Sequence, residues 1–260
     1  LAIVVVGENP LRYQKSKTCG ENIDRMGLDL LGTQNQLVQK IHETGVPTIV
    51  VLVGGRPLSV NWIAQNVQAL VQAWEPGSLG GRALANILAG KVNPSAKLPI
   101  SIPRHSGQIQ MIYNHKPSQY FHKYIDGPST PLYPFGFGLS YTRFAYSSLK
   151  LSHTRISDKD SFTASIELTN VGDREGTEVV QLYIRDIYSS ATRPVKELKD
   201  FARVTLKPGE KKTVTFTVTP DKLAYWNRNM QYGVEKGEFE IMIGSSSQDK
   251  DLKKVKMEVL

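Results

Sequence analysis

The sequence contains a single cysteine, Cys19, so no internal disulfide can form and a disulfide-stapled scaffold is excluded. It also lacks an apolar run of the roughly eighteen residues that a membrane-spanning helix needs. Glycine (21 of 260 residues) and proline (14) are near their average frequencies, which excludes collagen-like and disordered chains. With 40% hydrophobic and 22% charged residues, the chain can build one or two globular cores.

Acidic residues are scarce in the first part of the chain. Residues 1–144 hold 13 Lys and Arg against 7 Asp and Glu, whereas residues 145–260 hold 19 against 17. The net charge of +8 therefore reflects missing acids rather than a basic tract. Because the basic residues are scattered and no nucleic-acid-binding motif occurs, we do not expect a nucleic-acid partner.

Several motifs of cofactor and metal enzymes are missing. The strand-to-glycine turns at residues 6–10 and 53–57 lack G-x-G-x-x-G, and a proline interrupts each turn, which argues against dinucleotide binding. There is no G-x-S-x-G nucleophile elbow, and the histidines show no H-E-x-x-H or Cys/His metal spacing. The sequence thus predicts neither a cofactor nor a metal site.

The first 105 residues alternate between strand and helix patterns. A continuous apolar run at residues 1–6 predicts a buried strand, and because it carries no Met and no basic leader we expect the sequence to begin within a domain. A helical spacing over 29–43, a buried strand over 48–53, a third buried segment over 67–74 and a helix over 80–88 follow. This order predicts an open α/β sandwich domain over residues 1–105.

The remaining residues predict a connector and an all-β domain. Residues 106–144 hold five Tyr with several Pro and Gly but no clear periodicity, as in a long ordered connector. From residue 145 to residue 260 apolar residues alternate with polar ones, most clearly over 162–168, 179–184 and 213–218. We expect an immunoglobulin or fibronectin III-like β-sandwich over 145–260.

Two acids follow the first strand. Glu21 and Asp24 lie in the long loop on the carboxyl-end side of the predicted sheet, where open α/β sheets place their ligands. From the spacing alone, a solvated, locally hydrogen-bonded acid remains the favoured interpretation of either residue.

The loop has a recognisable pattern. The segment CGENIDRMGLDLLGTQ at residues 19–34 resembles the E-G-x-D-R-x-x-L-x-L-P-G-x-Q segment of glycoside hydrolase family 3. Further matches occur in the family's order: GRPL at 55–58, AWEPGSLGG at 73–81, GKVNPSAKLP at 90–99, PLYPFGFGLSYT at 131–142, and, resembling the family's fibronectin type III-like domain, TNVGDREG at 169–176 and RPVKEL at 193–198. The resemblance covers nearly the whole chain.

The resemblance implies a retaining, exo-acting β-glucosidase that hydrolyses terminal β-D-glucosyl residues of a β-linked glucoside or oligosaccharide. Such enzymes use two carboxylates about 5–5.5 Å apart, one as nucleophile and one as general acid/base. The family's acid/base glutamate corresponds to Glu21. Its nucleophile is an aspartate of an N-terminal (β/α)8 barrel that is absent from this chain, so the resemblance implies a barrel domain or chain as partner and no turnover by these residues alone.

Other residues of the loop receive supporting roles. Asp24 and Arg25 are expected to brace the loop through charge-assisted hydrogen bonds, and Arg12 and Tyr13 to line the rim of the sugar pocket. The sequence departs from the family pattern at residues 22–23, where the family often has small residues, and at Leu31, which replaces a proline.

The connector has two interpretations. The aromatic residues Tyr120, Phe121, His122 and Tyr124 could form a sugar-stacking platform or a homodimer contact, since aromatic faces bind sugars and anchor interfaces. Residues 133–141 are expected to serve packing instead.

Two alternatives to a β-glucosidase remain open. One is a β-xylosidase or another exo-glycosidase on the same scaffold. The other is a non-catalytic carbohydrate-binding or interaction module. Enzymes that resemble this chain are often periplasmic or secreted, which is the expected location.

Overall fold

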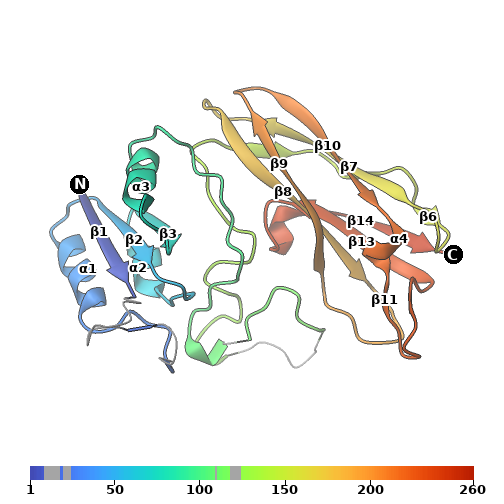
Figure 1. Ribbon diagram of the computed structural model, residues 1–260, viewed down its shortest axis with the longest axis horizontal. Helices are drawn as coiled ribbons and strands as arrows, with labels where there is room; N and C mark the ends of the chain where they lie inside the picture. The colour runs from blue at the N-terminus through green and yellow to red at the C-terminus, as the bar shows by residue number, and fades with distance from the viewer. Residues whose placement is uncertain (9–17, 20–24, 109, 118–123) are drawn as a thin grey trace. The chain divides into compact units, whose positions relative to one another are not determined.

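The computed structural model describes residues 1–8, 18–19, 25–108, 110–117 and 124–260 (Figure 1). The chain divides into two compact units. Unit 1 comprises residues 1–92, 101–111 and 124–133, and unit 2 comprises residues 93–100, 112–123 and 134–260.

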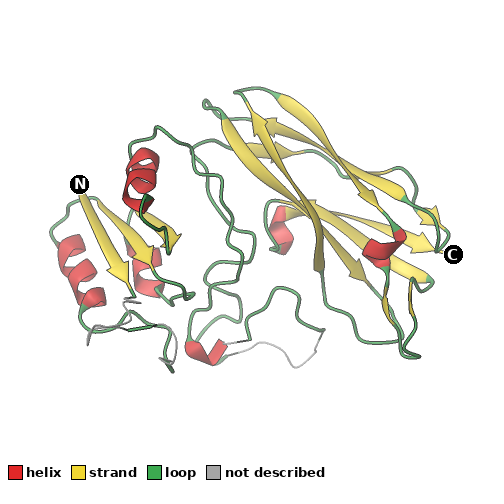
Figure 2. Cartoon of the chain, viewed as in Figure 1, coloured by secondary structure: helices red, strands yellow, loops and turns green. Residues whose placement is uncertain are grey.

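Unit 1 is built on a parallel sheet with the order β1-β2-β3 (Figures 1 and 2). Its elements are β1 (Ala2–Gly7), α1 (Gln34–Glu43), β2 (Thr48–Val53), α2 (Asn61–Asn66), β3 (Ala69–Trp74), α3 (Gly80–Leu88) and the short 3-10 helix η1 (Ser106–Gln108). Alternation of strands and helices in the sequence produces this topology, because parallel neighbours need a crossover connection. The α/β class predicted for this part is confirmed.

The core of unit 1 lies on one face of the sheet. Val4 of β1 pairs with Val50 of β2, and both pack with Val38 of α1 and Ile63 of α2 in one buried cluster. On the other face of β1, Ile3 and Val5 are 52% and 61% exposed. The prediction of a buried first strand is therefore wrong for this face, since a continuous apolar run does not tell which face is covered.

Other sequence predictions for unit 1 differ in detail. β2 and α3 have the predicted bounds, but the helix expected over 29–43 begins only at Gln34. Gly32, with φ of +64°, adopts a left-handed conformation that an α-helix does not continue through. α2 was not predicted, and β3 is half-buried throughout rather than buried.

Unit 2 contains a β-sandwich. One sheet has the order β10-β7-β4 with β5 also paired to β7, and the other has the order β6-β14-β13-β8-β9. The strands are β4 (Phe144–Tyr146), β5 (Lys150–Leu151), β6 (Arg155–Ile156), β7 (Phe162–Asn170), β8 (Gly176–Asp186), β9 (Glu197–Leu206), β10 (Lys211–Val218), β13 (Gly237–Gly244) and β14 (Leu252–Val259). The hairpin β11 (Tyr225–Trp226) and β12 (Tyr232–Gly233), the short helix α4 (Pro220–Leu223) and the 3-10 helix η2 (Asp249–Asp251) complete it.

The sandwich core comes from the alternation seen in the sequence. Along β7, buried residues alternate strictly with half-buried ones from Phe162 to Asn170. The buried set, which includes Ile166 of β7, Leu182 of β8 and Phe239 of β13, forms one cluster from both sheets. An all-β sandwich after the α/β part is thus confirmed.

Part of the connector packs on the sandwich. Gly136 has φ of +78°, and a Cβ there would lie 2.1 Å from Oε1 of Gln181 in β8. Gln181 donates from Nε2 to the carbonyl of Gly136 (3.1 Å). Nearby, the ring of Tyr113 stacks on Phe135 with centroids 4.2 Å apart and meets Tyr183 edge-on. Phe135 therefore serves packing, as expected for residues 133–141.

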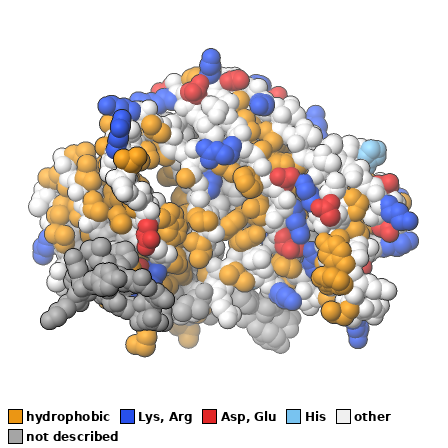
Figure 3. Space-filling view, in the orientation of Figure 1, with side chains coloured by type: hydrophobic (Ala, Val, Ile, Leu, Met, Phe, Trp, Pro, Cys, Tyr) orange, Lys and Arg blue, Asp and Glu red, His pale blue; other side chains and the backbone are white. Residues whose placement is uncertain are grey.

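Charged residues of both signs share the surface. On the face shown in Figure 3, acidic and basic side chains are interspersed over the strands of unit 2. Within the described part of the chain, no helix has the length and apolar character needed to cross a membrane.

Candidate functional site

The three parallel strands of unit 1 end at the same edge of their sheet. Glu8 directly follows β1, residues 54–56 follow β2, and Glu75 follows Trp74 at the end of β3. Ligands of open α/β sheets bind at the carboxyl ends of the strands. This edge is the candidate site, and its charged residues are Glu8, Arg25, Arg56 and Glu75.

Two glycines allow the strand ends to approach closely. A Cβ on Gly7 would lie 1.8 Å from the carbonyl oxygen of Val53, and φ at Gly7 is +148°. A Cβ on Gly54 would lie 3.1 Å from Cβ of Glu8. The backbone amide of Glu8 donates to the carbonyl of Val53 (2.8 Å). Glycine at residues 7 and 54 is thus what lets the Glu8 backbone lie against the end of β2.

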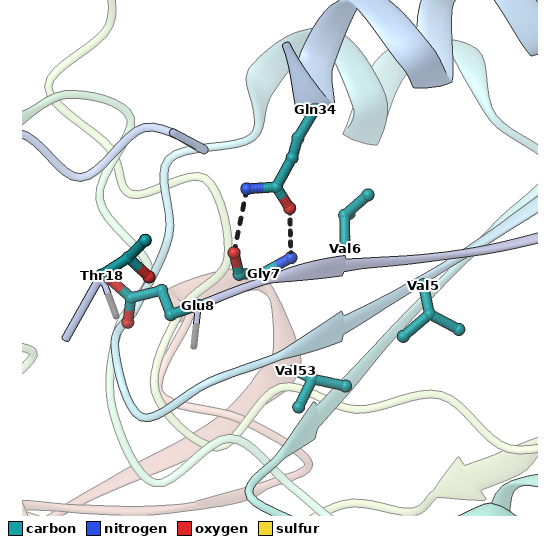
Figure 4. A pocket seen from close by; sticks show the side chains of 7 residues that line it. All are labelled: Val5, Val6, Gly7, Glu8, Thr18, Gln34 and Val53. Atoms are coloured by element: carbon teal, nitrogen blue, oxygen red, sulfur yellow. Dashed lines mark hydrogen bonds between the residues drawn. The ribbon is translucent and has the colours of Figure 1, made fainter. Parts of the chain in front are cut away.

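An amide side chain fixes the end of β1. Gln34, the first residue of α1, accepts a hydrogen bond from the amide of Gly7 at Oε1 (2.7 Å) and donates from Nε2 to the Gly7 carbonyl (3.0 Å) (Figure 4). Its Nε2 also donates to the carbonyl of Leu31 (3.0 Å). The beginning of α1 is therefore joined to the residue that precedes Glu8.

Glu8 is a buried carboxylate between two arginines. Its side chain is 1% exposed, and Oε1 lies 2.8 Å from Nη1 of Arg25 and 3.6 Å from Nε of Arg56. Oε2 is buried and has no hydrogen-bond partner among the described residues. Since a buried charge is stable only when it is paired, Glu8 depends on these arginines.

Arg25 joins Glu8 to the start of the segment that leads into α1. Its side chain is 10% exposed, and while Nη1 donates to Glu8, Nη2 donates to the backbone carbonyl of Asp29. Further along, the Leu28 carbonyl accepts from the amide of Ser59, in the loop after β2. The guanidinium thus uses two of its nitrogens to fix the chain immediately after residue 24.

Cys19 lies buried in the same electrostatic environment. Burial raises the pKa of its thiol, and the carboxylate of Glu8 raises that pKa further, while Arg56 lowers it. Glu75 and Arg25 also act on this pKa. Burial and the neighbouring carboxylate of Glu8 thus favour the protonated thiol.

Backbone strain marks the end of β3. Trp74 has φ of +54°, a left-handed conformation that is uncommon for a bulky residue. Its carbonyl accepts a hydrogen bond from the amide of Gly54 (2.9 Å), which ties the two strand ends together. The carboxylate of Glu75 lies beside Gly55, since a Cβ there would be 3.5 Å from Oε1 of Glu75. Strain of this kind persists only where the surrounding contacts impose it.

A shallow pocket of about 340 Å³ opens beside Glu8. Its lining combines the end of β1 with Thr18 and Gln34, and Figure 4 shows the Glu8 carboxylate next to Thr18. In this lining the Gln34 amide is already bonded to Gly7 and Leu31, and the Glu8 carboxylate to Arg25, so these two groups order the sheet edge itself.

The predicted site residues fall mostly outside this description. Glu21, Asp24, Arg12 and Tyr13 are not among the described residues, and neither are residues 120–122 of the predicted aromatic platform. Arg25 is described and makes the charge-assisted hydrogen bonds given above. The catalytic, rim and bracing roles assigned to these residues stay predictions.

The sequence analysis did not predict that Glu8 and Arg56 belong to the candidate site. Glu8 directly follows β1 and Arg56 lies in the turn after β2, at the edge where an α/β sheet gathers its functional side chains, and this position was the available signal. In the described ranges, no cluster of three or more His, Cys, Asp or Glu residues is arranged to hold a metal ion.

Comparison with known proteins gives two family matches. The glycosyl hydrolase family 3 C-terminal domain matches residues 1–141, more than half of the chain. A fibronectin type III-like domain matches residues 178–247, within the sandwich.

The proteins similar to this chain include β-xylosidases and β-glucosidases. A β-xylosidase of Formosa agariphila is 46% identical over 260 residues, which cover 99% of this chain and 35% of the relative. A periplasmic β-glucosidase of Salmonella typhimurium is 41% identical over 95% of this chain and 33% of the relative. The chain thus spans about a third of the length of these relatives.

Solved structures agree with the fold. A β-glucosidase of Erythrobacter marinus superposes with a TM-score of 0.91 at 40% identity, covering 99% of this chain and 34% of that one. A β-glucosidase of Listeria innocua in complex with glucose gives a TM-score of 0.90 at 34% identity, covering 99% and 36%.

Proposed function

Since the chain belongs to glycosyl hydrolase family 3, we propose that it is the acid/base-bearing C-terminal part of a longer retaining exo-β-glucosidase. Its substrates are terminal β-D-glucosyl residues of glucosides or oligosaccharides. The observation that carries the proposal is the family match over residues 1–141, a range that includes the pattern at residues 19–34.

Glu21 is the general acid/base in this proposal. In the first step its carboxyl group protonates the leaving oxygen while a nucleophilic carboxylate attacks the anomeric carbon, and in the second step it takes a proton from the attacking water. We place the nucleophile in a barrel domain of the longer protein, so these 260 residues alone have no turnover. Arg12 and Tyr13 line the sugar pocket, and Asp24 and Arg25 support the loop.

The geometry of unit 1 supports a functional loop at this place. The chain continues from the carboxyl end of β1; of the described residues that flank Glu21, Cys19 is buried and Arg25 is held by the buried Glu8 carboxylate. A catalytic carboxylate needs fixed flanks, because a misplacement of about 1 Å can cost about 100-fold in rate.

A β-xylosidase is the second candidate. The relative with 46% identity is a β-xylosidase, whereas the periplasmic β-glucosidase is 41% identical. Kinetics of the full-length enzyme on p-nitrophenyl β-glucoside and β-xyloside distinguish the two, since the sugar with the higher kcat/KM identifies the activity. The name of the Salmonella protein also leads us to propose a periplasmic or secreted location.

The role of Glu21 is tested by Glu21→Ala in the full-length enzyme. We expect kcat/KM on a phenyl glycoside to fall by about 10²–10⁴-fold, since this leaving group needs protonation. On a dinitrophenyl glycoside kcat/KM should change little, and azide should raise kcat by attacking the glycosyl-enzyme where the base is missing. Equal losses on both substrates without azide rescue would contradict the assignment. Glucose binding to these 260 residues that Glu21→Ala leaves unchanged, together with no partner barrel, would favour a non-catalytic module.

A further inference from the structure

We infer that Glu8 is a positioning residue of the glycosidase reaction, which acts by holding Arg25, four residues after Glu21 in the sequence, and Arg56 from a buried strand end. The inference rests on the proposed function of Glu21. Nothing in the family matches or in the names of the relatives assigns a role to Glu8.

The first step of the argument is the burial of Glu8. The side chain is 1% exposed, yet it carries a carboxylate where an apolar residue would fill the space without any cost of desolvation. One of its oxygens has no hydrogen-bond partner among the described residues. Stability of the fold is thus a weak reason for a charge here, because an isosteric apolar cluster is often as stable as a buried ion pair.

The second step is what the carboxylate holds. Nη1 of Arg25 lies 2.8 Å from Oε1, and the same guanidinium donates through Nη2 to the Asp29 carbonyl. The backbone of Glu8 is held to the sheet, because its amide is bonded to Val53 and both backbone groups of the preceding Gly7 are bonded to Gln34. The ion pair therefore holds the side chain of Arg25 at the edge of the sheet.

The third step is the distance along the chain. Arg25 comes four residues after Glu21 in the sequence. Cys19 is buried, and the charge of Glu8 acts on the pKa of its thiol. Arg25, the first described residue after the proposed acid/base, is held by Glu8, and we therefore expect the loss of this ion pair to lower the efficiency of Glu21.

The test is Glu8→Gln in the full-length enzyme, with the leaving group as the readout. Glutamine keeps the size and an acceptor oxygen but removes the charge that holds the arginines. We expect kcat/KM on a phenyl β-glycoside to fall by about 10–100-fold and on a dinitrophenyl β-glycoside by less than about 3-fold. Azide should raise kcat on the dinitrophenyl substrate, as for a weakened acid/base.

A matched control is available in unit 2. Glu178 forms a 2.8 Å ion pair with Lys97, and the two side chains are 8% and 13% exposed, close to the burial of the Glu8–Arg25 pair. Glu178→Gln should lower the unfolding temperature without changing the ratio of kcat/KM between the two substrates. A merely structural role of Glu8 predicts the same unchanged ratio for Glu8→Gln, and that result would overturn the inference.

A second variant covers the case in which Glu8→Gln does not fold. Arg25→Lys keeps the charge beside Glu8, but a single ammonium cannot reproduce the two-armed contact with Glu8 and the Asp29 carbonyl. It should show the same selective loss on the phenyl substrate, and an unchanged ratio would again reject the inference. If Glu21→Ala itself lacks the leaving-group signature, the proposed function fails, whereas a signature for Glu21→Ala alone refutes only the role of Glu8.

Discussion

The carboxyl end of the unit 1 sheet contains buried charge and unusual backbone conformations, whereas the sandwich of unit 2 is built on regular apolar packing. At the sheet end, a few residues combine a buried carboxylate, close backbone approach at Gly7 and a left-handed Trp74. In the sandwich, long strands alternate regularly around one large apolar cluster. Local violations of the rules of stability are expected at functional sites, which agrees with the proposal that the catalytic segment follows β1 in unit 1.

The largest loss of unfolding free energy is expected for a substitution of Gly7. In Gly7→Ala the new methyl group would meet the Val53 carbonyl at 1.8 Å, with backbone on both sides, so we expect a loss of about 3–5 kcal/mol of unfolding free energy. Gly209→Ala in unit 2 is the control, because its φ is +74° but no atom lies within 4 Å of the new methyl group. It should cost only the left-handed penalty of about 1–2 kcal/mol. Urea unfolding of both variants measures this, and equal losses would contradict the close approach.

A medium effect is expected at Asp186, where unit 2 does contain an irregularity. Burial raises the pKa of this carboxyl to about 6, although Arg193, 3.9 Å away, lowers it. Between about pH 4 and pH 6 the folded protein keeps a proton that the unfolded chain has released, so this group's contribution to stability falls as pH rises. Relative to Asp186→Asn, the parent should lose about 1–3 kcal/mol over this range and then stay level.

The measurement is urea unfolding of the parent and Asp186→Asn at pH 4, 5, 6 and 7. Asp160→Asn is the level control, because hydrogen bonds from Ser157 lower the pKa of the Asp160 carboxyl below its ordinary value. The stability that its carboxylate contributes is lost only as pH falls below that ordinary value, so the difference between parent and Asp160→Asn should stay nearly constant over this series. A difference between parent and Asp186→Asn that is constant with pH would show that Asp186 titrates normally.

The smallest change in unfolding free energy is expected for exposed ion pairs, which should contribute little to stability in either unit. Lys40 and Glu43 of α1 form a 2.7 Å ion pair, but their side chains are 77% and 57% exposed. Lys40→Met should change the unfolding free energy by less than about 0.5 kcal/mol, since water and salt screen such pairs. Thermal unfolding at low and high salt measures this change in unfolding free energy. A loss above about 1 kcal/mol would show that this exposed ion pair contributes more than a screened surface pair should.

Sequence patterns predicted the fold well where a local signal decides the structure. The period-two alternation around Ile166 and the apolar run at 48–53 became β7 and β2 because strand formation needs only such patterning. The patterns did not predict which face of a strand is buried. Ile3 and Val5 are apolar but exposed, because burial of this face depends on what packs over β1.

The candidate site was predicted in part. Its place after the first strand followed from the topology of parallel sheets, and the pattern at 19–34 pointed to Glu21 and Arg25. The pairing of Arg25 with Glu8 joins residues seventeen positions apart, and Arg56 comes from the turn after β2, so no local pattern could reveal these ion pairs. The role of Glu21 itself remains a prediction.

The Gln34 side chain has one further consequence, for the free edge of the unit 1 sheet. β1 is the outer strand of the described sheet, and an outer strand can template the addition of another chain through its unpaired backbone groups. At Gly7 those groups are already occupied by the glutamine amide, which imitates the peptide of an adjoining strand. Any segment that extends this sheet beside β1 must therefore stop before Gly7, leaving the neighbourhood of Glu8 clear of added backbone.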